Sequence, residues 1–541
     1  MPSVLACSLG NCVHISGVLS FLRVAQSVGY ETTFLGAATP VDALLDAVER
    51  QDPDLIAVSY RLTPEVAAGL FSELEQGLAA RGLSNKRLAL GGTPPVGEVG
   101  RQSGLFEAVF TGLEGPEEVR AYLEGGARAR AGEAPATTLV ERISRRAPQP
   151  LLRHHYGRPT VEATVEGARR LALAEAVDIL SIGPDQNAQE HFFRPQEMKP
   201  ELTGAGGVPL RTPDDLRAIY DATRCGNHPL VRCYSGTRDL LLWAEVHVET
   251  IDNAWGAIPL YWYNTLDRRS DRQPRQSIAE NIDAMAWYAR RGRPVECNEA
   301  HHWSMRDSHD TIAVAAAYLG AYVCKQVGVA TYVSQYMFNS PASTSGAMDL
   351  AKMLAKKQLI ETLCDDRFSV VHQTRAGLLC FSPEPDVAKG QLAASTVLQL
   401  QLAPQIVHVV GFCEGDHAAT VEDIVESCDI VRGALRQALS GSPDMTRDPA
   451  VQERKEELVA EAGLLLEALR ELGDGSSDPL CDPEVLARAV AEGYMDAPQL
   501  CGNEWAAGKL ATAPVDGAIR AIDFDTGRVI GEAERLRRLR R

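Results

Sequence analysis

The first 125 residues alternate between short apolar runs and amphipathic segments, and this alternation restricts the possible folds more than any other feature of the chain. Apolar runs of strand length occupy residues 4–9, 32–35, 55–59, 88–90 and 108–111. Apolar side chains recur at helical spacing between these runs, in residues 18–28, 41–51 and 64–81. Strands that alternate with helices predict a parallel sheet with helices on both faces. Residues 1–125 are therefore predicted to form a doubly wound, flavodoxin-like α/β domain.

Residues 151–440 repeat a similar pattern over a longer stretch. Eight β-rich apolar runs are separated by helical segments, at residues 151–155, 177–182, 230–234, 257–262, 294–297, 330–335, 368–372 and 406–410. Eight such units predict a (β/α)₈, or TIM, barrel, in which functional groups gather at the carboxyl ends of the strands. The predicted fold class is therefore α/β, with a doubly wound sheet and a barrel in one chain.

Two further segments flank the barrel. Residues 126–150 are rich in Ala, Arg, Gly, Pro and Thr, a composition typical of a linker. Residues 441–541 contain a charged amphipathic helix, predicted over residues 451–475, and continue into a loop-rich tail. We expect this C-terminal extension to pack on the barrel.

Small and polar residues follow three of the strands predicted in the first domain. The segment Asn11-Cys12-Val13-His14-Ile15-Ser16-Gly17 comes after the first strand, Ser59 ends the third, and Gly91-Gly92-Thr93 follows the fourth. A doubly wound sheet binds ligands beyond the carboxyl ends of its strands, so these residues are predicted to share one edge. His14 is the candidate metal ligand among them, because imidazole is a common donor to transition metals.

In this order the three segments resemble the cobalamin-binding domain that holds its cofactor base-off and His-on. The signature of that family runs Asp-x-His-x-x-Gly, then Ser-x-Leu, then Gly-Gly. The resemblance implies that His14 is the lower axial ligand of cobalt and that Gly17 is the glycine of the first motif. It also implies that the channel for the nucleotide tail of cobalamin (vitamin B12) is lined by Ser59, Gly91, Gly92 and Thr93.

The sequence departs from the family signature at two positions. Cys12 stands where the family has the aspartate that hydrogen-bonds the axial histidine, and Arg61 takes the leucine position. An aspartate makes a metal-bound imidazole more basic, and a thiol does so less well. Asn11 or a backbone carbonyl is an alternative hydrogen-bond partner for His14.

Composition excludes several classes of protein. A net charge of -18 disfavours a nucleic-acid partner, which requires a concentrated basic surface. No apolar run is long enough to cross a membrane, and the N-terminus lacks the charged region of a signal peptide. The twelve cysteines include no Cys-x-x-Cys pair, which argues against a zinc or iron–sulfur centre and against a disulfide scaffold. We therefore expect a cytoplasmic protein.

The barrel region and the tail resemble the large, catalytic subunit of glutamate mutase (methylaspartate mutase). The matching segments are Gly493-Tyr494-Met495-Asp496-Ala497-Pro498 with residues 503–509, the apolar pattern of residues 308–333, and residues 406–422. The N-terminal domain correspondingly resembles the small subunit of that enzyme, so the chain is similar to both subunits fused. The resemblance implies a radical mechanism, in which homolysis of the cobalt–carbon bond of adenosylcobalamin starts the rearrangement of a substrate.

The resemblance also assigns roles to individual residues. Arg232 and Arg158 are implied to hold a substrate carboxylate, whereas Gln189 occupies the position of a third carboxylate-binding arginine. Asn253 falls in the segment that replaces the family's glutamate for the substrate amino group, and the neighbouring family tyrosines correspond to Tyr261 and Tyr263. Near the adenosyl group the family's glutamate is retained as Glu414, while a nearby lysine becomes Val410. The implied catalytic residues are thus Glu414, Arg232 and Tyr263, and Glu414 would also contact the cofactor.

The replacements at Gln189 and Asn253 argue against glutamate as the substrate. A hydrogen bond to a buried charged group contributes about 1.5–3 kcal/mol, so the loss of an arginine and a glutamate weakens glutamate binding by orders of magnitude. We therefore predict a substrate other than glutamate.

Other groups of residues suggest other chemistry. His301 and His302, with Cys297, Glu299 and His309, resemble a metal cluster but match no standard zinc spacing. Cys413 and His417 suggest a nucleophile with a base, and residues 204–207 form a glycine-rich turn that could bind phosphate. No lysine is identified as a Schiff-base partner for pyridoxal phosphate.

The two resemblances imply an adenosylcobalamin-dependent enzyme that rearranges, or eliminates from, a small carboxylate or amino acid other than glutamate. A methylcobalamin-dependent methyltransferase is the alternative that the loss of the lysine at Val410 favours. A non-catalytic cobalamin sensor is the third. The expected partner is a small-molecule substrate, without nucleic acid or membrane, in a homodimer.

Overall fold

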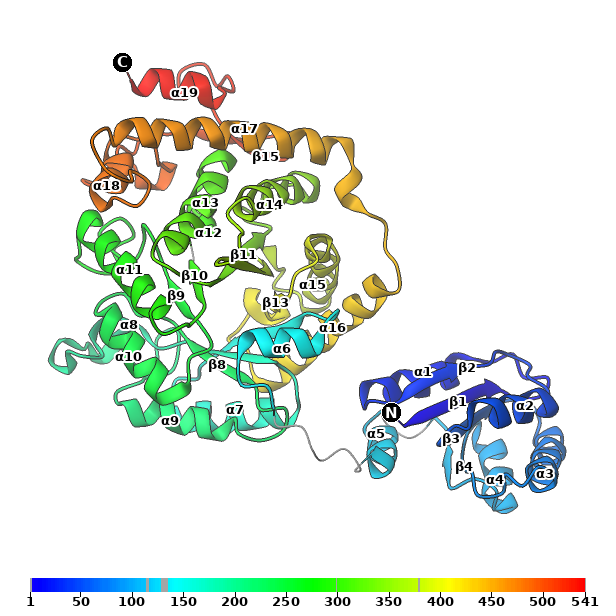
Figure 1. The fold of residues 1–541 in the computed structure, drawn as a ribbon. Coiled ribbons are helices and arrows are strands. Elements are labelled where there is room, and N and C mark those ends of the chain that lie inside the picture. Colours follow the sequence, from blue (N-terminus) through cyan, green and yellow to red (C-terminus); the bar gives the residue numbers. More distant parts are fainter. Residues whose placement is uncertain (1, 113–115, 128–134, 298, 378–379, 541) are drawn as a thin grey trace. The chain divides into compact units, whose positions relative to one another are not determined.

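The computed structural model describes residues 2–112, 116–127, 135–297, 299–377 and 380–540. The chain divides into two compact units, Met1–Ala134 and Pro135–Arg541 (Figure 1). Part of the segment predicted as a linker, residues 128–134, lies outside the described residues.

The first unit is a parallel five-stranded sheet with helices on both faces. Its strands run in the order β2-β1-β3-β4-β5, where the bounds are β1 (Ser3–Ser8), β2 (Glu31–Phe34), β3 (Leu55–Tyr60), β4 (Arg87–Gly92) and β5 (Ala108–Phe110). One face packs on α1 (Ser16–Ser27) and α5 (Pro116–Ala127). The other packs on α2 (Val41–Gln51), α3 (Pro64–Ala80) and α4 (Pro94–Ser103). The prediction of a doubly wound sheet is confirmed, and the strand order reverses between β1 and β3.

The second unit contains an eight-stranded, parallel, nearly closed barrel. Its strands run in the order β8-β7-β6-β13-β12-β11-β10-β9, with bounds β6 (Leu151–Tyr156), β7 (Ile179–Ile182), β8 (Leu230–Cys233), β9 (Gly256–Ile258), β10 (Val295–Cys297), β11 (Thr331–Phe338), β12 (Ser369–Ala376) and β13 (Ile406–His408). At the seam between β8 and β9, the N–H of Ala254 donates to the carbonyl of Val231 at 2.9 Å. The predicted TIM-type barrel is confirmed, and each of the eight predicted runs overlaps one strand.

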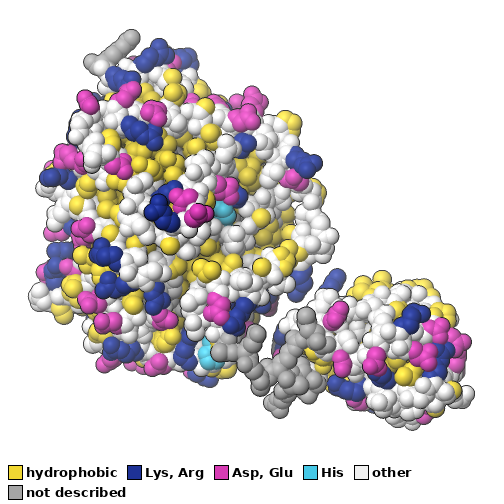
Figure 2. Space-filling model, in the orientation of Figure 1, with side chains coloured by type: hydrophobic (Ala, Val, Ile, Leu, Met, Phe, Trp, Pro, Cys, Tyr) yellow, Lys and Arg dark blue, Asp and Glu magenta, His cyan; other side chains and the backbone are white. Residues whose placement is uncertain are grey.

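Helices surround the barrel (Figure 1). They are α7 (Val161–Leu173), α8 (Gln186–His191), α9 (Pro213–Ala222), α10 (Leu240–Ile251), α11 (Pro274–Ala289), α12 (Ala300–Ser304), α13 (Asp310–Gln326), α14 (Gly346–Glu361), α15 (Pro385–Gln399) and α16 (Val421–Leu439). No helix of the described chain combines the length and the apolar character needed to cross a membrane. Acidic and basic side chains are interspersed over the face of the molecule drawn in Figure 2.

The barrel interior changes from apolar to polar along the strands. The apolar cluster at the amino-terminal ends contains Leu151, Ile179, Leu230, Ala257, Val333, Val371 and Ile406. Two residues further along several of these strands, the buried side chains are polar: Arg153, Ser181, Arg232, Gln335, Gln373 and His408. Side chains alternate in direction along a strand, so residues two positions apart face the same side. The carboxyl half of the barrel therefore encloses polar groups above an apolar floor.

A short helix covers the apolar floor. Helix α6 (Leu139–Arg146) packs Leu139 and Ile143 on the apolar cluster. Arg142, which is buried, donates from its guanidinium to the carbonyls of Ala136, Asn227 and His228. Residues 139–146 lie in the segment predicted as a linker, yet they form a packed part of the second unit. The glycine- and alanine-rich composition upstream of residue 139 concealed this helix.

The C-terminal extension belongs to the same compact unit as the barrel. It contains α17 (Pro449–Leu472), α18 (Pro483–Ala491), the antiparallel pair β14 (Thr512–Val515) and β15 (Ala518–Ala521), and α19 (Glu532–Leu539). Arg454 of α17 binds Asp310 of α13 at 3.2 Å, and the same carboxylate binds Lys352 of α14 at 3.3 Å. Because all three groups are buried, they hold α17 on the outer helices of the barrel.

Candidate functional site

His14 projects from the loop that follows β1, at the point where the strand order reverses. Its side chain is exposed, and its carbonyl accepts a hydrogen bond from the hydroxyl of Ser8 at 2.9 Å. The thiol of Cys12 lies 3.7 Å from Nδ1 of the imidazole. Among the described residues no group forms a hydrogen bond or ion pair with Nε2, so this nitrogen is free to bind a ligand.

The partner of His14 is therefore Cys12, not Asn11. The side-chain oxygen of Asn11 accepts a hydrogen bond from the hydroxyl of Tyr60 at 3.1 Å. Cys12 is fully buried, so its thiol is held against the ring. A thiol is a weak hydrogen-bonding group, and it leaves the imidazole less basic than a carboxylate partner does.

A cavity of about 270 Å³ lies between α1, α5 and the carboxyl halves of β3, β4 and β5. Four of the predicted tail-channel and motif residues line it: Gly17, Ser59, Gly91 and Gly92. Arg61 also lines the cavity, whereas Thr93 is not among the lining residues and instead precedes the first turn of α4. The lining is otherwise mainly apolar, which suits a flat organic ring system with few polar groups.

The glycines shape this cavity. A side chain at Gly92 would place its Cβ 2.9 Å from the carbonyl oxygen of Tyr60, which leaves no room for one. At Gly91 the nearest atoms to an added Cβ are 4.0 Å away, on Ser59 and Val58, and at Gly17 no atom lies within 4 Å. Gly91 and Gly17 therefore keep space open for a ligand, and Gly92 is required by the fold itself.

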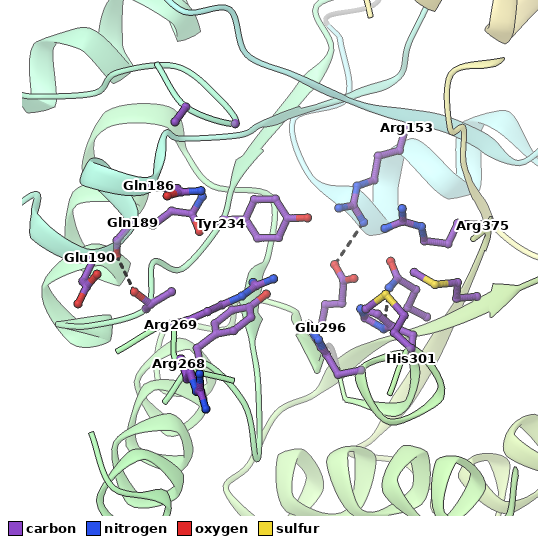
Figure 3. Close-up of a pocket in the computed structure, with 18 residues that line it drawn as sticks. Arg153, Gln186, Gln189, Glu190, Tyr234, Arg268, Arg269, Glu296, His301 and Arg375 are labelled. Carbon is purple, nitrogen blue, oxygen red and sulfur yellow. Dashed lines mark hydrogen bonds and ion pairs between the residues drawn. The ribbon is translucent and has the colours of Figure 1, made fainter. Parts of the chain in front are cut away.

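A second pocket, of about 550 Å³, opens at the carboxyl ends of the barrel strands (Figure 3). It reaches down to the polar layer through Arg153, Glu296 and Gln335. Higher up it is lined by aromatic, cationic and sulfur-containing side chains and by two histidines: Tyr234, Tyr263, Arg268, Arg269, Arg375, Met305, Met337, His301 and His302. Gln186, Gln189, Glu190, Ala205, Gly206 and Thr237 complete the wall.

A network of buried polar groups forms the base of this pocket. Arg153 donates to Gln373 at 2.7 Å and to Ser181 at 2.8 Å, and its Nη1 lies 3.3 Å from Glu296. Glu296 also accepts from the indole of Trp255 at 2.6 Å and from the amide of Gln373 at 3.2 Å. Desolvation opposes ionisation of Glu296, but the positive charges of Arg153 and the neighbouring Arg232 outweigh it and lower the pKa of the carboxyl. Glu296 is therefore an anion whose two oxygens both accept hydrogen bonds within the network.

The network continues to His301 and fixes the position of its proton. Gln373 donates to the side-chain oxygen of Gln335 at 3.2 Å, and the amide nitrogen of Gln335 donates to Nδ1 of His301 at 3.1 Å. Burial holds the pKa of His301 well below its usual value, and the charge of Arg375 adds to the effect. A neutral imidazole that accepts at Nδ1 carries its hydrogen on Nε2. His301 is thus a hydrogen-bond donor in the wall of the pocket.

The residues predicted to bind substrate are dispersed. Gln189 and Tyr263 line the pocket. Arg232 is fully buried, stacks over Tyr234 and Trp255, and has no hydrogen-bond partner at any of its three nitrogens in the described chain. Arg158 lies outside the pocket wall and donates to the carbonyls of Ala418 and Ala419.

The other two predicted substrate ligands are buried structural groups. The side chain of Asn253 accepts from the N–H of Cys233 at 3.1 Å and donates to the carbonyl of Trp255 at 2.9 Å. Tyr261 is fully buried among aromatic rings, 5.5 Å from the centre of Trp303. Glu414 is exposed on a short 3-10 turn, Phe412–Gly415, that follows β13, so it lies at the same end of the barrel as the pocket.

The alternative constellations are only partly brought together. His301 and His302 lie with ring centres 4.5 Å apart in the pocket. Glu299 instead accepts from the N–H groups of Leu260 and Tyr261, and His309 faces Glu532 at 3.4 Å. Ligand atoms of Cys413, His417 and Asp423 lie within 4.8 Å of one another, but Asp423 also caps α16 through Thr420. Ala205 and Gly206 of the glycine-rich turn line the barrel pocket.

The sequence analysis did not predict three charged residues that line the pocket. Arg153, Glu296 and Arg375 all lie within runs that were read as apolar strands or follow directly from them. A charged residue at an inward position of a barrel strand is costly unless it is paired or binds a ligand. This signal was present in the sequence, but it requires the strand register to separate inward from outward positions.

No protein-family model matches this chain, and no curated protein matches it. Among solved structures, a cobalamin-binding protein from Desulfitobacterium hafniense DCB-2 is 23% identical with a TM-score of 0.21, over 24% of this chain and 58% of that one. The cobalamin-dependent S-adenosylmethionine radical enzyme OxsB is similar over 88% of this chain and 69% of its own in the apo form, at 9% identity and a TM-score of 0.18. With aqua-cobalamin and S-adenosylmethionine bound, OxsB covers 90% of this chain and 70% of its own, at 10% identity and a TM-score of 0.19. At these TM-scores no residue role is transferred from either protein.

Proposed function

We propose that the chain is a cobalamin-dependent enzyme that binds its cofactor base-off, with Nε2 of His14 as the lower axial ligand of cobalt. The observation that carries this proposal is the pairing of an accessible imidazole with a tail-sized cavity in one small unit. Nδ1 of His14 faces Cys12, and Gly17, Ser59 and Gly91 line the cavity. A histidine in a surface loop of a domain that binds no cofactor would require neither an oriented imidazole nor a neighbouring cavity.

The barrel pocket is the proposed reaction site. Adenosylcobalamin, when bound, supplies an organic radical by homolysis of its cobalt–carbon bond. The chain itself supplies a pocket that is open at one end, with a floor sealed by α6 and with fixed hydrogen-bond donors in its wall. Such a site orients a small substrate and keeps water away from reactive intermediates. The favoured reaction is therefore the rearrangement of, or elimination from, a small acid, as in enzymes of the glutamate mutase type.

The test of the cofactor proposal is the ligand field of cobalt. Protein labelled with ¹⁵N-histidine is reconstituted with cob(II)alamin and examined by electron paramagnetic resonance. We expect the axial superhyperfine splitting to change from three lines to two, and His14→Ala to abolish this change. His228→Ala, which alters a half-buried histidine of the other unit, serves as the control. Three lines in the labelled protein, or two lines that persist in labelled His14→Ala, would contradict His-on binding.

The corrinoid that the protein retains separates the alternative reactions. Adenosylcobalamin, found by mass spectrometry after purification in the dark, supports the isomerase. Methylcobalamin supports a methyltransferase, which the replacement of a lysine by the buried Val410 also favours. A non-catalytic sensor retains a corrinoid but tolerates substitutions in the wall of the barrel pocket. The homodimer remains a proposal, and sedimentation of the purified chain tests it.

A further inference from the structure

The barrel interior contains more positive than negative charge. Three guanidinium groups, of Arg153, Arg232 and Arg375, are buried there, whereas Glu296 is the one buried carboxylate among the described residues of the network. Glu414 also acts electrostatically on Arg375, and desolvation raises the pKa of its carboxyl, but among the described residues it forms neither a hydrogen bond nor an ion pair with that guanidinium. Buried charges are strongly unfavourable unless they are paired, so two cations of this set require a compensating anion.

Arg375 is the cation that a ligand can reach. The residue is 7% exposed, it lines the pocket, and its Nε donates to the carbonyl of Ala376 at 3.3 Å. Among the described residues neither terminal nitrogen of this guanidinium has a hydrogen-bond partner. Figure 3 shows Arg375 and Arg153 on the same side of the pocket, with Glu296 below them. A guanidinium in this position is ready to bind a carboxylate with two parallel hydrogen bonds.

Arg232 lies one layer deeper and strengthens the same field. Its three nitrogens have no hydrogen-bond partner in the described chain, and its charge acts on both Glu296 and Arg375. Tyr234, which stacks on Arg232 and lines the pocket, separates it from the open space. Arg232 therefore attracts an anion from below, and Arg375 makes the contact.

The pocket offers little to an amino group. Both oxygens of Glu296 are occupied by Arg153, Trp255 and Gln373, and the side chain of Asn253 is used by the backbone of Cys233 and Trp255. Glu190, the other carboxylate in the wall, is half-buried and lies 3.5 Å from His191. His301 adds a neutral donor, because Gln335 holds its Nδ1.

We propose that the substrate of this site is a small dianionic acid without an amino group, and that Arg375 anchors one of its anionic ends. The proposal rests on the function proposed above, since it names the substrate of the same barrel site. The test of the substrate does not require the cofactor, so the substrate proposal and the cofactor proposal can fail independently. Arg375 is the specificity-determining residue, and His301 donates a hydrogen bond to the same ligand.

The test is a calorimetric titration of the full-length, cofactor-free protein with four probes: succinate, propionate, L-aspartate and inorganic phosphate. We expect the Kd for succinate to be at least about 10-fold lower than that for propionate or L-aspartate. Among these three acids only succinate brings two negative charges to the contact with Arg375 and the field of Arg232 without also bringing an ammonium group. Phosphate that binds as tightly as succinate identifies a single dianionic group rather than two separate carboxylates. Succinate that binds no better than propionate, or L-aspartate that binds best, overturns the proposal.

Variants assign the effect to Arg375. Arg375→Gln is expected to raise the Kd for succinate by about 10- to 100-fold and to remove its advantage over propionate. If the glutamine variant is unstable, Arg375→Lys is measured in its place. It keeps the charge but not the paired geometry, so we expect a smaller loss of succinate affinity. Arg367→Gln, at an exposed arginine just before the same strand, is the control. Unchanged succinate binding in both Arg375 variants contradicts the assignment, and an unchanged cobalamin spectrum in them shows that the first unit is intact.

Discussion

The thiol of Cys12 lies 3.7 Å from Nδ1 of His14, in the position from which a second group orients a metal-binding imidazole. Because a neutral thiol is a poor acceptor, His14 is a weaker donor to cobalt than a histidine paired with a carboxylate. Cys12→Asp is therefore expected to tighten cobalamin binding by about 10- to 100-fold and to increase the fraction bound through histidine. Titration followed by the cobalamin absorption spectrum measures both quantities. Cys12→Ala, which removes the contact, should weaken binding, and equal affinities in the two variants would show that the contact has no effect.

Gly91 keeps the cavity of the first unit open. An added Cβ there meets no atom closer than 4.0 Å, so the fold tolerates a larger residue that intrudes on the cavity. Gly91→Val is expected to reduce cobalamin affinity by at least about 10-fold while the thermal midpoint changes little. Gly69→Ala, at a helical position with open space around it, is the matched control. If Gly91→Val kept full cobalamin affinity, the nucleotide tail of cobalamin would not bind in this cavity.

Glu296 stabilises the barrel by compensating buried arginines. Glu296→Gln leaves the guanidinium groups of Arg153 and Arg232 without a negative neighbour, and loss of one partner of a buried ion pair destabilises a protein by about 3–5 kcal/mol. We expect a large fall in the free energy of unfolding, measured by urea denaturation. The double variant Glu296→Gln with Arg153→Met should recover part of it, since it removes one unpaired charge. A double variant no more stable than the single one contradicts this account.

Lys356 is expected to make stability depend on pH. Burial, assisted by the positive charge of Lys352, lowers the pKa of Lys356 from 10.5 to about 7. Below pH 7 the folded protein carries a buried ammonium group, whereas between pH 7 and 10.5 only the unfolded chain binds this proton, so stability rises with pH across that window.

Lys356→Met should therefore stabilise the protein at pH 6, by roughly 1–4 kcal/mol, and less at pH 9.5. Thermal unfolding at the two pH values measures the difference. Lys357→Met, at the neighbouring lysine that pairs with Glu361 on the surface, is the control and should show no such pattern. A gain that is equal at both pH values would contradict the assigned titration.

The fold could be predicted from the sequence because apolar runs directly indicate which segments are buried. All thirteen predicted strands of the two units overlap observed strands, and helices α2 and α3 start at the predicted residues, Val41 and Pro64. Helix α6 was missed, since its eight residues are too short and too charged to show a clear period beside a glycine-rich segment. Near the C-terminus, Arg535 is buried although the surrounding sequence is rich in charged residues, and it donates to the carbonyls of Gly493 and Tyr494.

The candidate site was accessible only where its residues follow one another in the chain. The loop from Cys12 to Gly17 could be read as a unit, and the structure brings Ser59 and Gly91 to the same cavity. The barrel pocket is lined by residues of β6, β10, β11 and β12 and of the segments that follow β7, β8 and β9, and which strand residues face inward depends on register. For this reason Arg375 was not predicted. The substrate role implied for Arg158 stays a prediction; in the structure its guanidinium donates to the carbonyls of Ala418 and Ala419.

Helix α6 has a kinetic consequence. Leu139 and Ile143 of this helix cover the amino-terminal end of the barrel. Molecules therefore enter and leave the pocket at the carboxyl ends of the strands. Substrate and product therefore use the same route and the same pocket. We expect the product to inhibit the reaction competitively with respect to the substrate.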